Sequence, residues 1–161
     1  MKTSKMKGFT LIELIVVIAI IGVLAAILVP SMIGYVGSSK LATANSNAKL
    51  AFENAATYCT ESEVAGYTTS AGQTLTSVDL STANTSGAGG TYVKDGSHLK
   101  EALGSLMGGT KNAGFASVKI SDAGVPSSAA WAKTTQDLYV GQYPNETTTK
   151  TTGGLANASL S

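Results

Sequence analysis

The stretch KGFTLIELIVVIAIIGVLAAILVP, from Lys7 to Pro30, sets the architecture of the whole chain. Between Phe9 and Val29 it holds twenty-one residues, of which only Thr10 and Glu13 are polar. A helix of that length spans about 30 Å, the thickness of the hydrocarbon core of a bilayer. Fifteen of the residues are Leu, Ile, Val or Phe. At roughly −0.3 to −0.6 kcal/mol each they favour insertion by at most about 5 to 9 kcal/mol, which one terminal carboxylate does not cancel. We therefore expect a single membrane-spanning helix.

Three lysines, Lys2, Lys5 and Lys7, precede the apolar run. By the positive-inside rule they hold the N-terminus in the cytoplasm, so the rest of the chain is extracytoplasmic. A basic start before an apolar run also fits an ordinary signal peptide. This run is longer than a usual signal-peptide core, it carries Glu13, and no clean small-x-small cleavage site follows it. A conventional cleaved signal is therefore disfavoured.

Glu13 needs a positive partner, because an ionisable group within a membrane helix is costly when it stands alone. No lysine is near it on the same helix. A cut between Gly8 and Phe9 would create an α-amino group at the right depth, and glycine lets a protease approach the backbone closely. Glu13 would then be the fifth residue of the shortened chain. The alternative is that its carboxylate only reaches the headgroup region.

Together these residues resemble the N-terminal signature of type IV pilins and the related pseudopilins. The resemblance covers residues 5–33, about a fifth of the chain. It implies that a membrane-embedded prepilin peptidase cuts after Gly8, the last residue of a leader, and methylates the new amino group of Phe9. Beyond residue 33 the sequence carries no signature of this family.

The same resemblance implies roles for three further residues. Glu13 would neutralise the Phe9 amine of a neighbouring subunit in a filament, which specifies the register of the two copies more than it adds stability. Gly22 lowers helix propensity by about 1 kcal/mol relative to alanine, and Pro30 removes a backbone hydrogen bond. The stretch between them would bend at Pro30 or lose helicity in the assembled fibre.

Beyond the apolar run a different pattern continues the helix. Ser38 or Ser39 is a candidate cap where the helix resumes after Gly34 and Gly37, and Gly66 is a candidate stop. Small and apolar residues recur at steps of three and four and predict one helical face that packs on a sheet. This face comprises Leu41, Ala44, Ala48, Phe52, Ala55 and Cys59.

The next two segments are expected to be irregular and then helical. Residues 68–93 are rich in Ser, Thr and Gly and predict a long surface loop. Residues 98–107, HLKEALGSLM, predict a short helix in which His98 is a solvated first-turn residue. Its inward side chains would be Leu99, Leu103, Leu106 and Met107.

Three β-rich segments, 115–121, 129–134 and 137–143, predict a three-stranded antiparallel meander. The tail after Pro144 is of low complexity and is expected to be mobile or a weak edge strand. The largest core contacts of the meander would come from Trp131, Tyr139 and Phe115.

The composition argues against several classes of function. The chain has no arginine, and without residues 1–8 its eight lysines face ten acidic residues, so nothing steers it to nucleic acid. Cys59 is the only cysteine, which rules out an intramolecular disulfide. With one histidine and one cysteine, we expect no metal, no cofactor and no enzymatic activity.

The predicted fold is α+β and type IV pilin-like, with a long N-terminal helix packed on a small antiparallel sheet. Residues 1–8 would be the leader and 9–33 the transmembrane and polymerising helix. Residues 34–65 would be the amphipathic half of the same helix, and 66–161 the extracytoplasmic head.

The resemblance implies a structural subunit, a prepilin, of a type IV pilus. Before assembly it would cross the cytoplasmic membrane once with its N-terminus in the cytoplasm, and afterwards it would lie in a cell-surface pilus. Its partners would be further copies of itself, prepilin peptidase, and the pilus assembly platform with its ATPase. The alternative is a pseudopilin of a type II secretion or competence (DNA-uptake) apparatus. The single cysteine departs from the disulfide-closed loop of many diderm pilins, which favours a monoderm source or a pseudopilin.

Overall fold

The computed structural model describes residues 8–69, 71–81, 96, 98–107 and 114–160. The chain divides into two compact units, Met1–Gly37 and Ser38–Ser161. Of the predicted leader only Gly8 lies within the described residues. The second half of the predicted surface loop, residues 82–93, also lies outside them.

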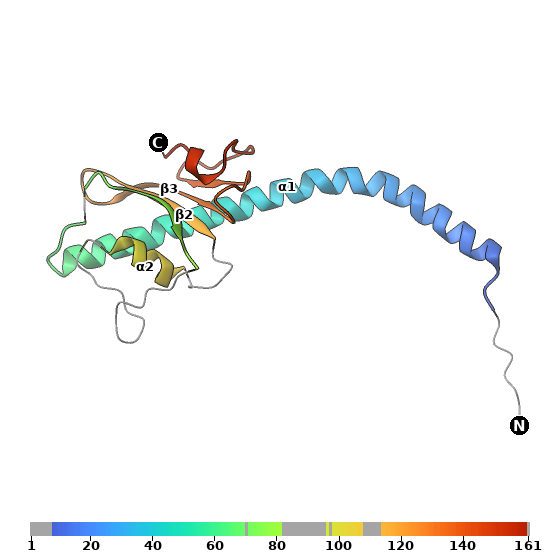
Figure 1. Cartoon of the computed structure of the whole chain (residues 1–161), viewed down its shortest axis with the longest axis horizontal. Coiled ribbons are helices and arrows are strands. Elements are labelled where there is room, and N and C mark those ends of the chain that lie inside the picture. The colour runs from blue at the N-terminus through green and yellow to red at the C-terminus, as the bar shows by residue number, and fades with distance from the viewer. Residues whose placement is uncertain (1–7, 70, 82–95, 97, 108–113, 161) are drawn as a thin grey trace, which may run out of the picture. The chain divides into compact units, whose positions relative to one another are not determined.

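The predicted long helix is confirmed as α1, Leu11–Val64, with 54 residues (Figure 1). It is uninterrupted, so the expectation that Ser38 or Ser39 caps a second helical start is wrong. The nearby Gly34 and Gly37 each lower helix propensity by about 1 kcal/mol but keep their backbone N–H, and so the hydrogen-bond ladder continues through them.

Gly66 ends α1, as predicted. Its φ of 87° is in the left-handed region that glycine adopts at little cost. The N–H of Gly66 donates to the carbonyl of Glu63 at 2.9 Å, and that of Tyr67 donates to Ser62 at 2.9 Å. This pair of bonds is the Schellman motif, which satisfies two of the last free carbonyls of the helix.

The sheet has four antiparallel strands in the order β1-β2-β3-β4. The strands are β1, Thr74–Asp79; β2, Phe115–Ile120; β3, Pro126–Ala132; and β4, Gly141–Tyr143. The antiparallel meander is therefore confirmed in β2 to β4, although β4 starts at Gly141 and not at residue 137. Among the described residues, the sheet therefore has one strand more than the three that were predicted.

The additional strand, β1, lies where a surface loop was expected, so that expectation is wrong for Thr74–Asp79. The register shifts between Leu75 and Val78, where Ser77 has a φ of 50° and its N–H donates to the Ser117 side chain at 3.0 Å. Leu75 and Val78 both face the main core. The bulge spaces them three residues apart in place of two, which conceals the alternation typical of a strand.

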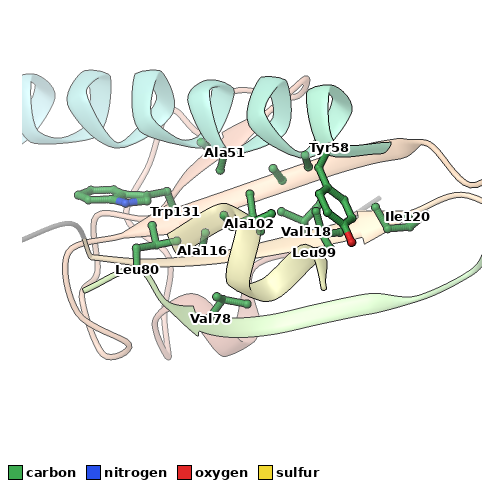
Figure 2. Close-up of a cluster of buried hydrophobic side chains, with 14 of the residues drawn as sticks. Ala51, Tyr58, Val78, Leu80, Leu99, Ala102, Ala116, Val118, Ile120 and Trp131 are labelled. Carbon is green, nitrogen blue, oxygen red and sulfur yellow. The ribbon is translucent and has the colours of Figure 1, made fainter. Parts of the chain in front are cut away.

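The main core lies between the sheet, α1 and α2, Leu99–Leu106 (Figure 2). The predicted face of α1 is confirmed: all its members are buried except Phe52, which is half-buried against the same cluster. The short helix is confirmed too, with Leu99 and Leu103 inward. Trp131 belongs to this core as expected. The fully buried Tyr58 was not anticipated, and its hydroxyl accepts the N–H of His98 at 2.9 Å.

A second, smaller cluster covers the other face of the sheet. Ala130 and Ala132 alternate along β3 with Ala129 and Trp131, so they face away from α1. Leu155 of the short helix η1, Leu155–Asn157, packs on them and is 2% exposed. The tail was expected to be mobile or an edge strand, and that expectation is wrong in this segment because its apolar side chain closes an open sheet face.

Asn45 of α1 holds β4 and the tail in place. Its side-chain amide donates to the Thr147 carbonyl at 2.9 Å, and its oxygen accepts the N–H groups of Gln142 at 3.1 Å and Thr147 at 3.2 Å. A Cβ at Gly141 would run into the backbone of Ala44, so only glycine allows so close an approach of β4 to the helix.

Tyr139 is not a core residue, which corrects the sequence-based expectation. It is half-buried, and the ammonium groups of Lys40 and Lys150 each lie 5.3 Å from the centre of its ring. Its place in the core is taken by fully buried side chains, among them Tyr58, Leu80, Leu99 and Leu103.

Candidate assembly segment

The described part of the first unit presents apolar side chains on every side. All residues from Gly8 to Val36 are exposed, with Phe9 82% and Leu11 75% accessible. Within the described residues, α1 is the one helix long and apolar enough to cross a membrane. Contiguous exposed apolar surface of this size is rare on soluble monomers and marks a surface that lipid or another protein covers.

Thr10 and Glu13 form a reciprocal cap at the start of α1. One carboxylate oxygen of Glu13, Oε2, accepts the Thr10 N–H at 2.9 Å and the Thr10 hydroxyl at 2.6 Å. The Glu13 N–H in turn donates to the Thr10 hydroxyl at 3.4 Å. This is a capping box, which accounts for the start of the helix at Leu11. Sequence reasoning missed Thr10, although the T-x-x-E pattern before an apolar run is its signal.

The capping box leaves part of the Glu13 carboxylate available. Among the described residues, the hydrogen bonds to the carboxylate use Oε2 and none uses Oε1. In the uncut chain the Phe9 nitrogen is an uncharged peptide nitrogen, so the predicted ion pair requires cleavage first. The pairing of Glu13 with a neighbour's amine stays a prediction.

Gly8 and Phe9 precede the helix and are both exposed. A protease needs its substrate in a non-helical conformation, and these residues satisfy that requirement. Whether the chain is cut between them, and whether Phe9 is methylated, stay predictions.

Gly22 and Pro30 both lie inside α1. A Cβ at Gly22 would meet no atom within 4 Å, so the isolated chain gives no steric reason for glycine there. Pro30 has no N–H, which leaves the Ala26 carbonyl without its helical donor. At the next residue, the Ser31 hydroxyl donates to the Leu28 carbonyl at 2.9 Å. The predicted bending or melting between Gly22 and Pro30 remains a prediction.

The remaining chemically versatile residues do not gather into a site. His98 is the N-cap residue of α2 and is half-buried. Cys59 is a buried free thiol whose pKa is raised, chiefly by burial, which keeps it in the less reactive protonated form. In the part of the chain that the structure describes, no three His, Cys, Asp or Glu residues are placed to hold a metal ion.

Comparison with known proteins points to one class of protein. Residues 3–29 match the prokaryotic N-terminal methylation motif. The chain is 54% identical over 43 residues to the type IV major pilin protein PilA of Myxococcus xanthus, strain DK1622, covering 27% of this chain and 20% of that protein. It is 60% identical over 38 residues to the fimbrial protein EcpC of Eikenella corrodens, covering 24% of this chain and 25% of that one.

The type IV major fimbrial protein FimA of Dichelobacter nodosus is 55% identical over 38 residues, which is 24% of each chain. The chain thus matches only a fifth to a quarter of the length of these relatives. No solved structure matches it significantly.

Proposed function

We propose that this chain, a member of the type IV pilin family, is the prepilin that builds a type IV pilus, polymerising through residues 9–33. The observation that carries the proposal is the apolar first part of α1, exposed on every side from Gly8 to Val36. Such a surface needs lipid before assembly and other copies of itself afterwards. Residues 34–65 would be the amphipathic half of the helix, and 66–161 the head.

Processing by prepilin peptidase would remove residues 1–8 and methylate the new N-terminus at Phe9. The match of residues 3–29 to the N-terminal methylation motif supports this step. The non-helical, exposed Gly8–Phe9 junction gives a protease access to the backbone. Since the three lysines ahead of the apolar run hold the N-terminus in the cytoplasm, the cut would take place on the cytoplasmic side.

Cleavage would also change what Glu13 can do. It produces a cationic amine at Phe9 on every copy, at the same end of the helix as the carboxylate. In lipid or in a filament core, a charge without a partner is strongly unfavourable. The axial offset between neighbouring copies that brings the amine and the carboxylate together would therefore be favoured. Oε1 would accept the neighbour's amine while Oε2 keeps the bond to Thr10.

Assembly would require work against the membrane. The apolar run favours insertion by at most about 5 to 9 kcal/mol, and that amount has to be recovered in helix packing or supplied from outside. An assembly platform with its ATPase would supply it, and the subunit would pass from a single span in the cytoplasmic membrane to the cell-surface pilus. Neither an enzymatic activity nor a cofactor is part of this proposal.

The proposal is tested on filaments sheared from the native host. Intact-mass analysis should give a chain that begins at Phe9 and carries one methyl group. Gly8→Gln should block cleavage and leave the precursor in the membrane, whereas Gly34→Ala, whose Cβ would meet no atom within 4 Å, should be processed normally. Assembled material that retains residues 1–8 would contradict the proposal.

Electron microscopy with an antibody to residues 66–161 separates the two members of this class. Long labelled filaments on the cell surface identify a pilus subunit. Processed, membrane-bound protein without such filaments would favour the pseudopilin of a secretion or competence apparatus.

A further inference from the structure

A cavity of about 290 Å³ lies at the start of the second unit, between the first residues of that unit and the end of β3. Its walls combine cationic and aromatic side chains with two short polar ones. They include Ser39, Lys40, Trp131, Lys133, Asp137 and Tyr139. None of these residues has a part in the cap at Glu13.

The cavity carries an excess of positive charge. Lys40 and Lys133 line it, and Lys150 lies on the ring of Tyr139 together with Lys40, each ammonium 5.3 Å from the ring centre. Asp137 also lines the cavity, and its carboxylate accepts the Tyr139 N–H at 3.0 Å, so the lining holds two ammonium groups and one carboxylate. In the described part of the chain no carboxylate lies within 4.0 Å of the ammonium group of Lys40 or Lys150. Ammonium groups that line one cavity favour an anion between them.

The position of Lys40 along the chain suggests where that anion comes from. From Leu11 to Val36 the exposed helix is about 39 Å long at 1.5 Å per residue. A bilayer with its headgroups is about 40–45 Å thick. Ser39 and Lys40 follow this span by three and four residues, so the headgroups at its far end are the nearest lipid groups along the chain. Tryptophan and tyrosine are the residues typically found at that level.

We infer that this cavity binds the headgroup of an anionic phospholipid in the outer leaflet while the subunit spans the membrane before assembly. The phosphate would lie between the ammonium groups of Lys40 and Lys133, with the glycerol carbons against Trp131 and Tyr139. Ser39 and Asp137 offer hydrogen-bond acceptors to a hydroxylated headgroup, as in phosphatidylglycerol. This inference rests on the proposed membrane insertion and adds a lipid ligand to it.

Trp131 is the chain's one tryptophan, so its fluorescence reports on the cavity. The full chain in a neutral detergent is titrated with dihexanoyl phosphatidylglycerol, and in parallel with dihexanoyl phosphatidylcholine and with inorganic phosphate. A saturable emission change is expected with phosphatidylglycerol alone. Each lysine near a lipid surface contributes about a fivefold gain in affinity, so K40Q combined with K133Q should weaken binding about 25-fold. K40R should restore most of the loss caused by K40Q.

The control is K100Q, which changes an exposed lysine of α2 outside the cavity and should leave the titration unchanged. Equal responses to phosphatidylcholine or to inorganic phosphate would overturn the inference. An unaltered titration of the double variant would also overturn it. So would a double variant that has lost its thermal transition, because the weaker binding would then result from unfolding. Self-association that the same two substitutions abolish would assign the cavity to a second copy and also overturn it. Filament yield and N-terminal mass are measured separately, so a failure here is distinct from a failure of the pilus proposal.

Discussion

Asn45→Ala should destabilise the second unit by about 2 to 4 kcal/mol. The substitution removes three hydrogen bonds, one to the Thr147 carbonyl and two from the N–H groups of Gln142 and Thr147. Each such bond contributes about 0.5–1.5 kcal/mol net, and a buried donor left without an acceptor costs more. Gln142 and Thr147 are half-buried, so water can replace some of the lost hydrogen bonds. The destabilisation therefore stays below the upper end of the summed hydrogen-bond energies.

Urea unfolding of the full chain in neutral detergent, followed by Trp131 fluorescence, measures the effect. With a slope of about 2 kcal/mol per molar urea, the midpoint should fall by about 1 to 2 M. Asn45→Asp keeps an acceptor but loses the donated hydrogen bond, so it should lose less stability than Asn45→Ala. Asn47→Ala, two residues along the same helix, should change stability by about 0.5 kcal/mol or less. Equal midpoints for Asn45→Ala and Asn47→Ala would refute the role assigned to Asn45.

Three further predictions concern assembly and packing. Glu13→Gln keeps the capping box, since an amide oxygen also accepts from Thr10, but removes the charge, so processed subunit should accumulate in the membrane and sheared filament yield should fall steeply. Thr10→Ala, which leaves the charge in place, should retain most filaments; a wild-type yield from Glu13→Gln would mean that its carboxylate only reaches the headgroups. Gly141→Ala should displace β4, because its Cβ would enter the backbone of Ala44, and a near-ultraviolet circular dichroism spectrum like that of wild type would contradict this. A chain that begins at Ser38 should be soluble, folded and monomeric by light scattering, and large oligomers at micromolar concentration would count against two separable parts.

The long helix and its buried face could be predicted because each follows from a regular pattern. A membrane-length apolar run has few ways to satisfy its backbone other than a helix. The steps of three and four from Leu41 to Cys59 then continue that helix with one apolar face, which packs on the sheet. The short helix α2 followed from the same periodicity.

The missed features depend on contacts between distant segments. β1 was missed because the bulge at Ser77 breaks the alternation, and that bulge is held by the Ser117 side chain forty residues away. The tail was judged by its composition. Leu155, however, packs on a face of the sheet, and the local sequence of the tail does not predict that contact. Tyr139 was placed in the core by its size, yet it is half-buried, and the ammonium groups of Lys40 and Lys150 lie near its ring.

The Glu13 prediction shows a different limit. The sequence-based explanations of its charge were a neighbouring copy or the lipid headgroups, although Thr10 already binds the carboxylate within one chain. A single residue can serve both purposes because a carboxylate has two oxygens. A sequence shows that the charge is present, but only the positions of Oε1 and Oε2 show which part of it is still available.

The small side chains of α1 at the sheet have a mechanical consequence. Ala44, Ala48, Ala51 and Ala55 are each 1% exposed or less, and an alanine has no rotamer to change. In the proposed filament, this contact therefore cannot yield to tension by gradual rearrangement of its side chains, and it either holds or separates as a unit. Amide hydrogens of this stretch should exchange only when the whole second unit opens, with no slower and faster subsets along the helix. A fibre of such subunits would lengthen first at places outside this contact.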